Sequence, residues 1–214
     1  MKILLLPLIV LTISCNREEP QYLEYSNYAP IVDGKPEKIW AQIKPNQLYF
    51  YYGQEAEDSL DIKSYCKVLQ HKDNIYIFVI VYDQIKYTHP KPTNIYDLRL
   101  WKPENYDQVS LSFDADNDGK DDFSISMNYG LDTVFTNNIL QKEIEAALSE
   151  TSNGYNVEFK IPLKFFKTSI IKFNVVVTDN DRRFDKEGLD VFSLCESKYG
   201  RGFIYKKITF EKGI

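Results

Sequence analysis

The chain has 214 residues, of which 43% are hydrophobic and 27% charged, as expected for one soluble domain with its own core. Its net charge is −5 and its lysines and arginines are scattered among acids, which excludes the concentrated basic surface that a nucleic-acid partner requires. Aromatic residues make up 14% of the chain against only 9 Gly and 9 Pro, which favours a β-rich fold over disorder or a helical bundle.

The first residues have the pattern of an export signal. Lys2 precedes an apolar run over 3–13 that is too short to span a bilayer and ends in small residues before Cys15. Residues 11–15 resemble a bacterial lipobox, so we expect a signal peptide over 1–14 and lipidation of Cys15, with a plain signal peptide as the alternative.

Residues 15–27 are expected to be a tether. The acidic residues near its start resemble the surface-export signal of Bacteroidetes lipoproteins. The expected location is therefore a bacterial membrane, reached through the lipid anchor only, on the periplasmic side or at the cell surface.

The pattern of the first half predicts strands separated by turns. Residues 28–40 predict a strand, an Asp-Gly turn and a helical turn that places Trp40 in the core. Strands are also predicted at 48–52 and 59–69, and the apolar run 75–82 predicts a central strand covered on both faces. Residues 84–105 lack periodicity and predict a long loop, which contains Trp101.

Residues 106–129 predict two strands joined by an acidic loop. Apolar and polar side chains alternate on both sides of the loop, which is the period-2 pattern of half-buried strands. Within the loop, Asp recurs at every second position before a turn at Gly119, as in loops that bind calcium through oxygen ligands. The candidate calcium ligands are Asp114, Asp116, Asp118, the Lys120 carbonyl and Asp122. A solvated acidic turn is the alternative.

The second half continues the strand pattern. A strand is predicted near 133–136, and residues 140–149 fit either a helix or a hairpin with 155–161, of which we prefer the hairpin. Further strands are predicted at 172–178 and 203–210. Many short strands with short turns predict one all-β domain over 28–214, an antiparallel β-sandwich of jelly-roll-like type. Cys66 and Cys195 either form a disulfide or remain thiols.

Several segments occur in the order found in a known family. They are Ile31-Val32-Asp33-Gly34 before Trp40, Asn74-Ile75-Tyr76-Ile77-Phe78-Val79, Tyr106-Asp107-Gln108-Val109 before Phe113-Asp114, Gly154-Tyr155 before Val157-Glu158-Phe159, and Phe173-Asn174 before Asn180-Asp181. Together they resemble the family 9 carbohydrate-binding modules and their DOMON-like relatives, over about residues 28–211. The resemblance implies a calcium-stabilised β-sandwich that binds sugars, commonly as a module attached to a glycoside hydrolase.

A sugar site combines an aromatic ring, which stacks on the C–H face of the sugar, with polar groups that match its hydroxyls. The candidates are Trp101 and Tyr106 for stacking, and Arg99, Asp107, Asp179 and Asp181 for the polar contacts. Alternatively, Trp101 packs its loop against the sandwich, and the acidic residues are solvated side chains at the ends of strands. Sugar-binding members of the family have a Glu, an Arg and a second Trp where this chain has Ser110, Ser126 and the segment 192–194.

We therefore expect a non-catalytic, exported lipoprotein that binds a polysaccharide or oligosaccharide, with calcium holding the loop that frames the site. The three departures favour an alternative, a divergent sandwich that acts as a structural or protein-interaction part of the cell envelope. The expected protein partner is a glycoside hydrolase or an envelope complex. Catalysis has little support, because the two histidines, His71 and His89, lie in no context that resembles a nucleophile and its base.

Overall fold

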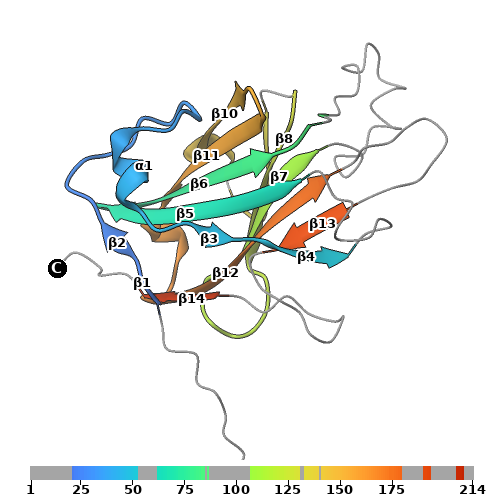
Figure 1. The fold of residues 1–214 in the computed structure, drawn as a ribbon. Helices are drawn as coiled ribbons and strands as arrows, with labels where there is room; N and C mark the ends of the chain where they lie inside the picture. Colours follow the sequence, from blue (N-terminus) through green and yellow to red (C-terminus); the bar gives the residue numbers. More distant parts are fainter. Residues whose placement is uncertain are drawn as a thin grey trace, which may run out of the picture.

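The computed structural model describes residues 21–52, 62–84, 86, 107–130, 133–139, 141–179, 190–193 and 206–209. Two β-sheets pack face to face, and the short helix α1 (Lys38–Gln42) lies on the outside of one of them (Figure 1). The predicted antiparallel β-sandwich is confirmed. No helix in the described part of the chain is long and apolar enough to cross a membrane.

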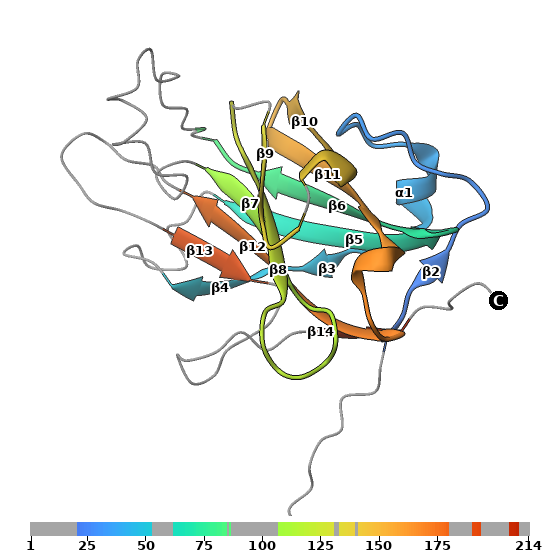
Figure 2. The same ribbon diagram turned by 180° about the vertical axis from the view of Figure 1, so that it is seen from behind.

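One sheet has eight strands within the described residues, and Figure 2 shows it from the front. Its order is β1-β14-β12-β7-β8-β9, with β13 beside β12 and β4 beside β13. In the described part of this sheet, β1 and β14 pair in parallel and all other pairs are antiparallel. The strands are β1 (Gln21–Tyr22), β4 (Tyr49–Tyr52), β7 (Gln108–Asp114), β8 (Phe123–Asn128), β9 (Val134–Asn137), β12 (Ile170–Asp179), β13 (Asp190–Ser193) and β14 (Lys206–Thr209).

The other sheet has six strands in the described ranges, ordered β10-β11-β6-β5-β2, with β3 also paired to β5. Its pairs are antiparallel except for β2 with β5. The strands are β2 (Glu24–Tyr25), β3 (Asn46–Gln47), β5 (Lys63–His71), β6 (Asn74–Tyr82), β10 (Glu145–Thr151) and β11 (Gly154–Pro162). Two single turns of 3-10 helix, Gln141–Glu143 and Leu163–Phe165, precede β10 and follow β11.

The core lies between the sheets and is built by the predicted alternation. The inward side chains of β7 and β8, from Val109 to Phe113 and from Phe123 to Met127, are buried, and the Phe113 and Phe123 rings stack with centroids 4.7 Å apart. Burial of such side chains is the main favourable term in folding. The alternation therefore fixes which face of each strand turns inward.

The hairpin preferred for residues 140–161 is confirmed, with β10 and β11 paired in register. Its turn needs Gly154, which has a φ of +144° and lies so close to β6 that an added Cβ would stand 2.0 Å from the Val81 carbonyl oxygen. A larger residue would break this contact.

The strand predicted within residues 28–33 is wrong, since this segment forms no strand. The backbone N–H groups of Asp33 and Gly34 are instead bonded to the side chain of Glu158 on β11, which takes them away from any strand ladder. The helical turn that follows is confirmed, and Trp40 is core as predicted, 1% exposed and stacked on Phe78 at 5.3 Å.

Coverage of β6 on both faces is only partly confirmed. The segment around α1 covers the outer face at Tyr76 and Phe78, but Ile80 is half-buried and Tyr82 is 44% exposed. The apolar run of β6 therefore extends past the part of the sheet that α1 protects.

Candidate functional site

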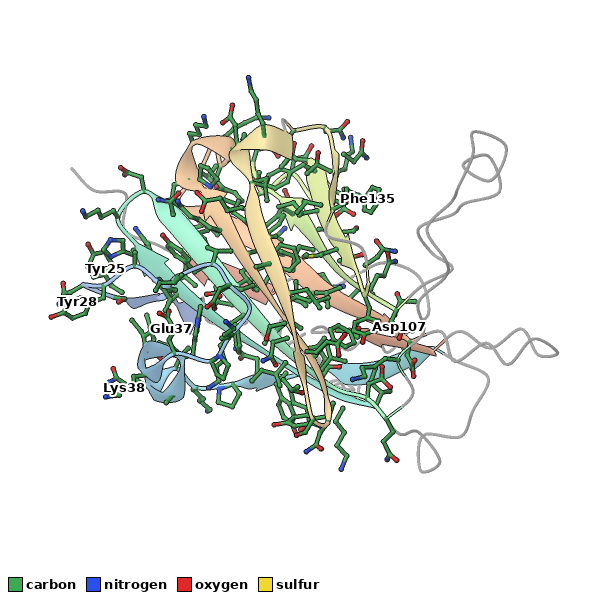
Figure 3. All side chains as sticks on the ribbon, turned by 90° about the horizontal axis from the view of Figure 1, so that it is seen from above. Tyr25, Tyr28, Glu37, Lys38, Asp107 and Phe135 are labelled. Carbon is green, nitrogen blue, oxygen red and sulfur yellow. The ribbon has the colours of Figure 1, made fainter. Side chains whose placement is uncertain are left out.

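Three strand ends bring three aspartates together at one end of the sandwich. Asp83 follows β6, Asp107 precedes β7 and Asp179 ends β12, and one carboxylate oxygen from each lies within 4.8 Å of the others. Their exposed fractions are 2%, 0% and 3%. We call these three residues the Asp triad; Figure 3 shows Asp107 toward the end of the molecule opposite Tyr25 and Tyr28.

Tyr129 and Tyr155 lie beside the Asp triad, with ring centroids 5.1 Å apart. Burial, and after it the charges of Asp107 and Asp83, raises the pKa of Tyr155 well above its usual range. Burial and a 2.8 Å hydrogen bond from its hydroxyl to Glu150 raise the pKa of Tyr129 to about 12. Both phenols therefore stay protonated at neutral pH.

The acidic loop between β7 and β8 brings together three of the five predicted calcium ligands. Carboxylate oxygens of Asp114, Asp116 and Asp122 lie within 4.8 Å of one another, whereas Asp118 is outside this group. Asp118 accepts a 2.9 Å hydrogen bond from the backbone N–H of Lys120. The structure therefore gathers part of the predicted ligand set, and calcium binding in this loop stays a prediction.

The chain itself supplies partners to the loop carboxylates. Asp114 accepts hydrogen bonds from the N–H groups of Asp118 and Gly119, at 3.0 and 2.9 Å. Lys167 lies 2.8 Å from Asp116, and this hydrogen bond lowers the pKa of Asp116 and raises that of Lys167. Backbone donors and a lysine thus offset much of the charge that a cation would otherwise neutralise.

A further buried acid, Glu158, lies on the outer face of the six-stranded sheet. It accepts hydrogen bonds from Trp40 Nε1 at 3.1 Å and from the N–H groups of Asp33 and Gly34 at 3.3 Å each. Burial raises the pKa of Glu158 to about 7, and the three donors limit the rise. Gly34 has a φ of +73°, and an added Cβ would lie 2.7 Å from Ser149 N, so glycine is required where the turn meets Glu158.

The predicted sugar-stacking residues, Trp101 and Tyr106, lie outside the described residues, as do Arg99 and Asp181. Their roles stay predictions. The other two candidates, Asp107 and Asp179, belong to the buried Asp triad, so their carboxylates lie beneath the surface. Cys15 and Cys195 are also outside the described ranges, and Cys66 is buried in the core.

Two of the three positions expected to differ from sugar-binding members of the family are adjacent in space. Ser110 on β7 and Ser126 on β8 are cross-strand partners, and the Ser110 hydroxyl donates a 2.9 Å hydrogen bond to that of Ser126. The two expected sites of a Glu and an Arg therefore hold a neutral pair of hydroxyls.

Sequence reasoning missed Asp83 and Glu158 as members of these clusters. The signal for Asp83 was its place directly after the apolar strand β6, mirrored by Asp107 directly before β7. Glu158 interrupts the apolar residues of β11, which marks a buried charge that needs donors. Neither signal names the partners, because these come from distant parts of the chain.

Residues 32–197 match the family described as carbohydrate family 9 binding domain-like. A family 9 carbohydrate-binding module from Caldicellulosiruptor kristjanssonii in complex with cellotriose is similar in fold, with a TM-score of 0.70, 16% identity, and coverage of 92% of this chain and 95% of that one. The module from the same organism in complex with glucose has a TM-score of 0.69, 16% identity and coverage of 92% and 97%. No curated protein matches the sequence. The match over 32–197 spans most of the sequence, and the chain belongs to the carbohydrate family 9 binding domain-like family.

Proposed function

We propose that this protein binds carbohydrate without transforming it. The observation that carries the proposal is membership of the carbohydrate family 9 binding domain-like family over residues 32–197. It is supported by the fold shared, over 92% of this chain, with a module whose structure contains cellotriose. The family is one of carbohydrate-binding modules, which supports a non-catalytic role, with a glycoside hydrolase or an envelope complex as the proposed partner.

The proposed contact surface is built by Trp101 and Tyr106, with Arg99 and Asp181 as hydrogen-bonding groups. Support comes from the Asp triad, which places Asp107, the residue next to Tyr106, and Asp179 at one end of the sandwich. Since both are buried, we propose that they hold the base of the site while the aromatic rings meet the sugar.

The second candidate is a sandwich without sugar binding that serves as a structural or interaction part of the envelope. The observation that favours it is the Ser110–Ser126 pair, which provides neither the charge nor the reach of a Glu and an Arg. The two candidates differ in whether any glycan is retained.

The test compares binding of an oligosaccharide panel by the wild-type protein, Trp101→Ala and Tyr28→Ala. Tyr28 is 78% exposed and lies away from Asp107, so its replacement is a matched loss of a surface aromatic ring (Figure 3). We expect Trp101→Ala to weaken binding at least about tenfold, since stacking on an aromatic ring is a main term in such sites, and Tyr28→Ala to leave it unchanged. Equal binding by all three proteins contradicts the proposed platform.

We also propose that calcium stabilises the fold. Two groups of carboxylates suit a hard cation that prefers oxygen ligands: Asp114, Asp116 and Asp122 in the acidic loop, with Asp118 and the Lys120 carbonyl as further ligands, and the Asp triad. The acidic loop already has Lys167 beside Asp116, whereas the Asp triad concentrates three buried carboxylates.

A ligand that binds only the folded protein raises its apparent stability. Thermal unfolding should therefore occur at higher temperature with calcium than with chelator. If Asp116→Asn abolishes this difference, calcium binds in the loop; if Asp116→Asn retains it, the acidic loop is not the calcium site. An unfolding temperature that is the same with calcium and with chelator in the wild-type protein contradicts calcium binding altogether.

Export as a lipoprotein anchored at Cys15, facing the periplasm or the cell surface, is proposed from the sequence pattern of residues 1–27. In cell fractionation, the wild-type protein should be found with membranes and Cys15→Ala in the soluble fraction. Release of the wild-type protein without membrane attachment contradicts the anchor.

A further inference from the structure

The outer face of the six-stranded sheet carries a groove whose described lining includes none of the residues named for the proposed contact surface. Its volume is about 490 Å³, within the range of roughly 300–1,000 Å³ typical of small-molecule sites. The groove lies on β5 and β6 beside Pro45, which follows α1. Among the described elements, α1 lies over the opposite end of these two strands (Figure 1). Its lining residues are Pro45, Lys63, Tyr65, Lys67, Ile80 and Tyr82.

The strand register places these side chains on one face. Lys63, Tyr65 and Lys67 alternate along β5 with buried residues, and Tyr65 is directly opposite Ile80 on β6. Lys63 is opposite Tyr82 in the same way. The sheet therefore forms the floor of the groove, in which the pair Tyr65 and Ile80 lies between the ammonium groups of Lys63 and Lys67.

An aromatic pair forms one side of the groove. The rings of Tyr65 and Tyr82 meet edge to face, with centroids 6.1 Å apart and an interplanar angle of 85°. Tyr82 is 44% exposed, so part of its ring is available to a ligand. A partly exposed ring fixed by a neighbour can stack on the C–H face of a pyranose with little loss of side-chain freedom.

The charge of the groove is opposite to that of the chain. The chain carries a net charge of −5, yet among the described residues that line the groove two are lysines and none is an acid. Among the described residues, neither Lys63 nor Lys67 forms an ion pair. Lys67 Nζ donates to the Trp40 carbonyl oxygen at 2.5 Å, which holds the ammonium in place and leaves its other protons for a ligand.

We infer that this groove binds an acidic oligosaccharide, a chain of pyranose rings that carry carboxylates. The Tyr82 ring would stack on one pyranose, and Lys63 and Lys67 would donate charge-assisted hydrogen bonds to the carboxylates. The inference rests on the proposed function, and adds to it a site lined by described residues of β5 and β6, with its own class of ligand.

The test is titration calorimetry of the purified protein with tetragalacturonate and with its methyl ester, which has the same rings without the charge. We expect the acidic oligomer to bind at least about tenfold more tightly than the ester, and this preference to shrink as salt is added. Lys63→Gln should weaken binding of the acid by about tenfold and leave binding of the ester unchanged. Lys38→Gln, a lysine on α1 outside the groove, is the matched control and should bind like the wild-type protein (Figure 3).

The aromatic contact is tested separately. Tyr82→Ala should weaken binding of both oligomers, while Tyr82→Phe should keep it because the ring remains. Each of three results overturns the inference: equal affinity for acid and ester, normal binding by Lys63→Gln, or concentration-dependent self-association that Tyr82→Ala abolishes, since the last assigns the groove to a second copy of the chain.

The two proposals fail in different ways. Loss of acid binding in Trp101→Ala, with normal binding in Lys63→Gln and Tyr82→Ala, would overturn the groove and support the platform. Loss of acid binding in the groove variants, with normal binding in Trp101→Ala, supports the groove whether or not the platform holds.

Discussion

Among the buried carboxylates of the described residues, Glu158 and the Asp triad have different surroundings. Glu158 stands alone against three N–H donors supplied by Trp40, Asp33 and Gly34. The Asp triad instead places three carboxylates within 4.8 Å of one another at the strand ends. A single buried charge can be satisfied by the chain's own donors, whereas converging like charges favour a bound cation or a proton.

The largest effect is expected where the donors lose their acceptor. Glu158→Ala leaves one indole N–H and two backbone N–H groups buried, and we expect it to lower the free energy of unfolding by about 4 kcal/mol at pH 5.5. Glu158→Gln keeps an acceptor oxygen and should cost about 1–2 kcal/mol. Denaturant unfolding measures both. A Glu158→Ala protein within 1 kcal/mol of the wild type would show that the donors find other partners.

The next effect is a dependence of stability on pH. The pKa of Glu158 is raised from 4.5 to about 7, so the folded protein holds this proton more tightly than the unfolded chain. Its contribution is fully present below pH 4.5 and is lost as pH rises through about 7, a change of about 3 kcal/mol.

The difference in unfolding free energy between the wild type and Glu158→Gln isolates this contribution. The wild-type value minus the variant value should fall between pH 4.5 and 8, because the wild type loses stability as Glu158 ionises. A constant difference across this range would show that Glu158 is ionised in the folded protein throughout.

Replacing one residue of the Asp triad should change the free energy of unfolding in opposite directions with and without calcium. In chelator, Asp83→Asn removes one of three repelling charges and should stabilise the protein by about 1 kcal/mol. With calcium it should be less stable than the wild type by about 2 kcal/mol, since it loses a ligand of the cation. Asp73→Asn, an exposed acid in another turn, is the control. The same sign in both buffers contradicts a cation at the Asp triad.

The smallest effect on stability is expected in the acidic loop. Lys167→Ala removes the partner of Asp116, and this exposed ion pair should contribute so little that the unfolding temperature barely changes. If calcium binds there, the variant should bind it more tightly, since the lysine no longer competes for the carboxylate. Calcium titration followed by calorimetry measures this, and a weaker affinity would show that Lys167 does not oppose the ion.

The parts of this fold that local pattern decides were predictable from sequence. Val109, Leu111 and Phe113 alternate with polar residues, and that alternation alone places β7 with one face in the core. Asn153 and Gly154 likewise mark the hairpin turn, because few residues adopt the backbone that Gly154 adopts. The family resemblance carried by segments such as 106–114 was also confirmed.

The parts decided by distant contacts were not predictable. Residues 28–33 look like a strand, but Glu158, more than a hundred residues later, takes the N–H groups of Asp33 and Gly34. The apolar run of β6 predicted cover on both faces, yet α1 is too short to reach Tyr82. The Asp triad draws on three strand ends that no local pattern relates.

Retention of this protein on a panel of polysaccharides and oligosaccharides decides whether it binds carbohydrate. The panel should include cellulose and cello-oligosaccharides beside acidic glycans, each with calcium and again with chelator. We expect retention on at least one glycan, and weaker retention in chelator. Retention on none, by a protein shown to be folded, would contradict it and leave a sandwich with a structural or protein-interaction role.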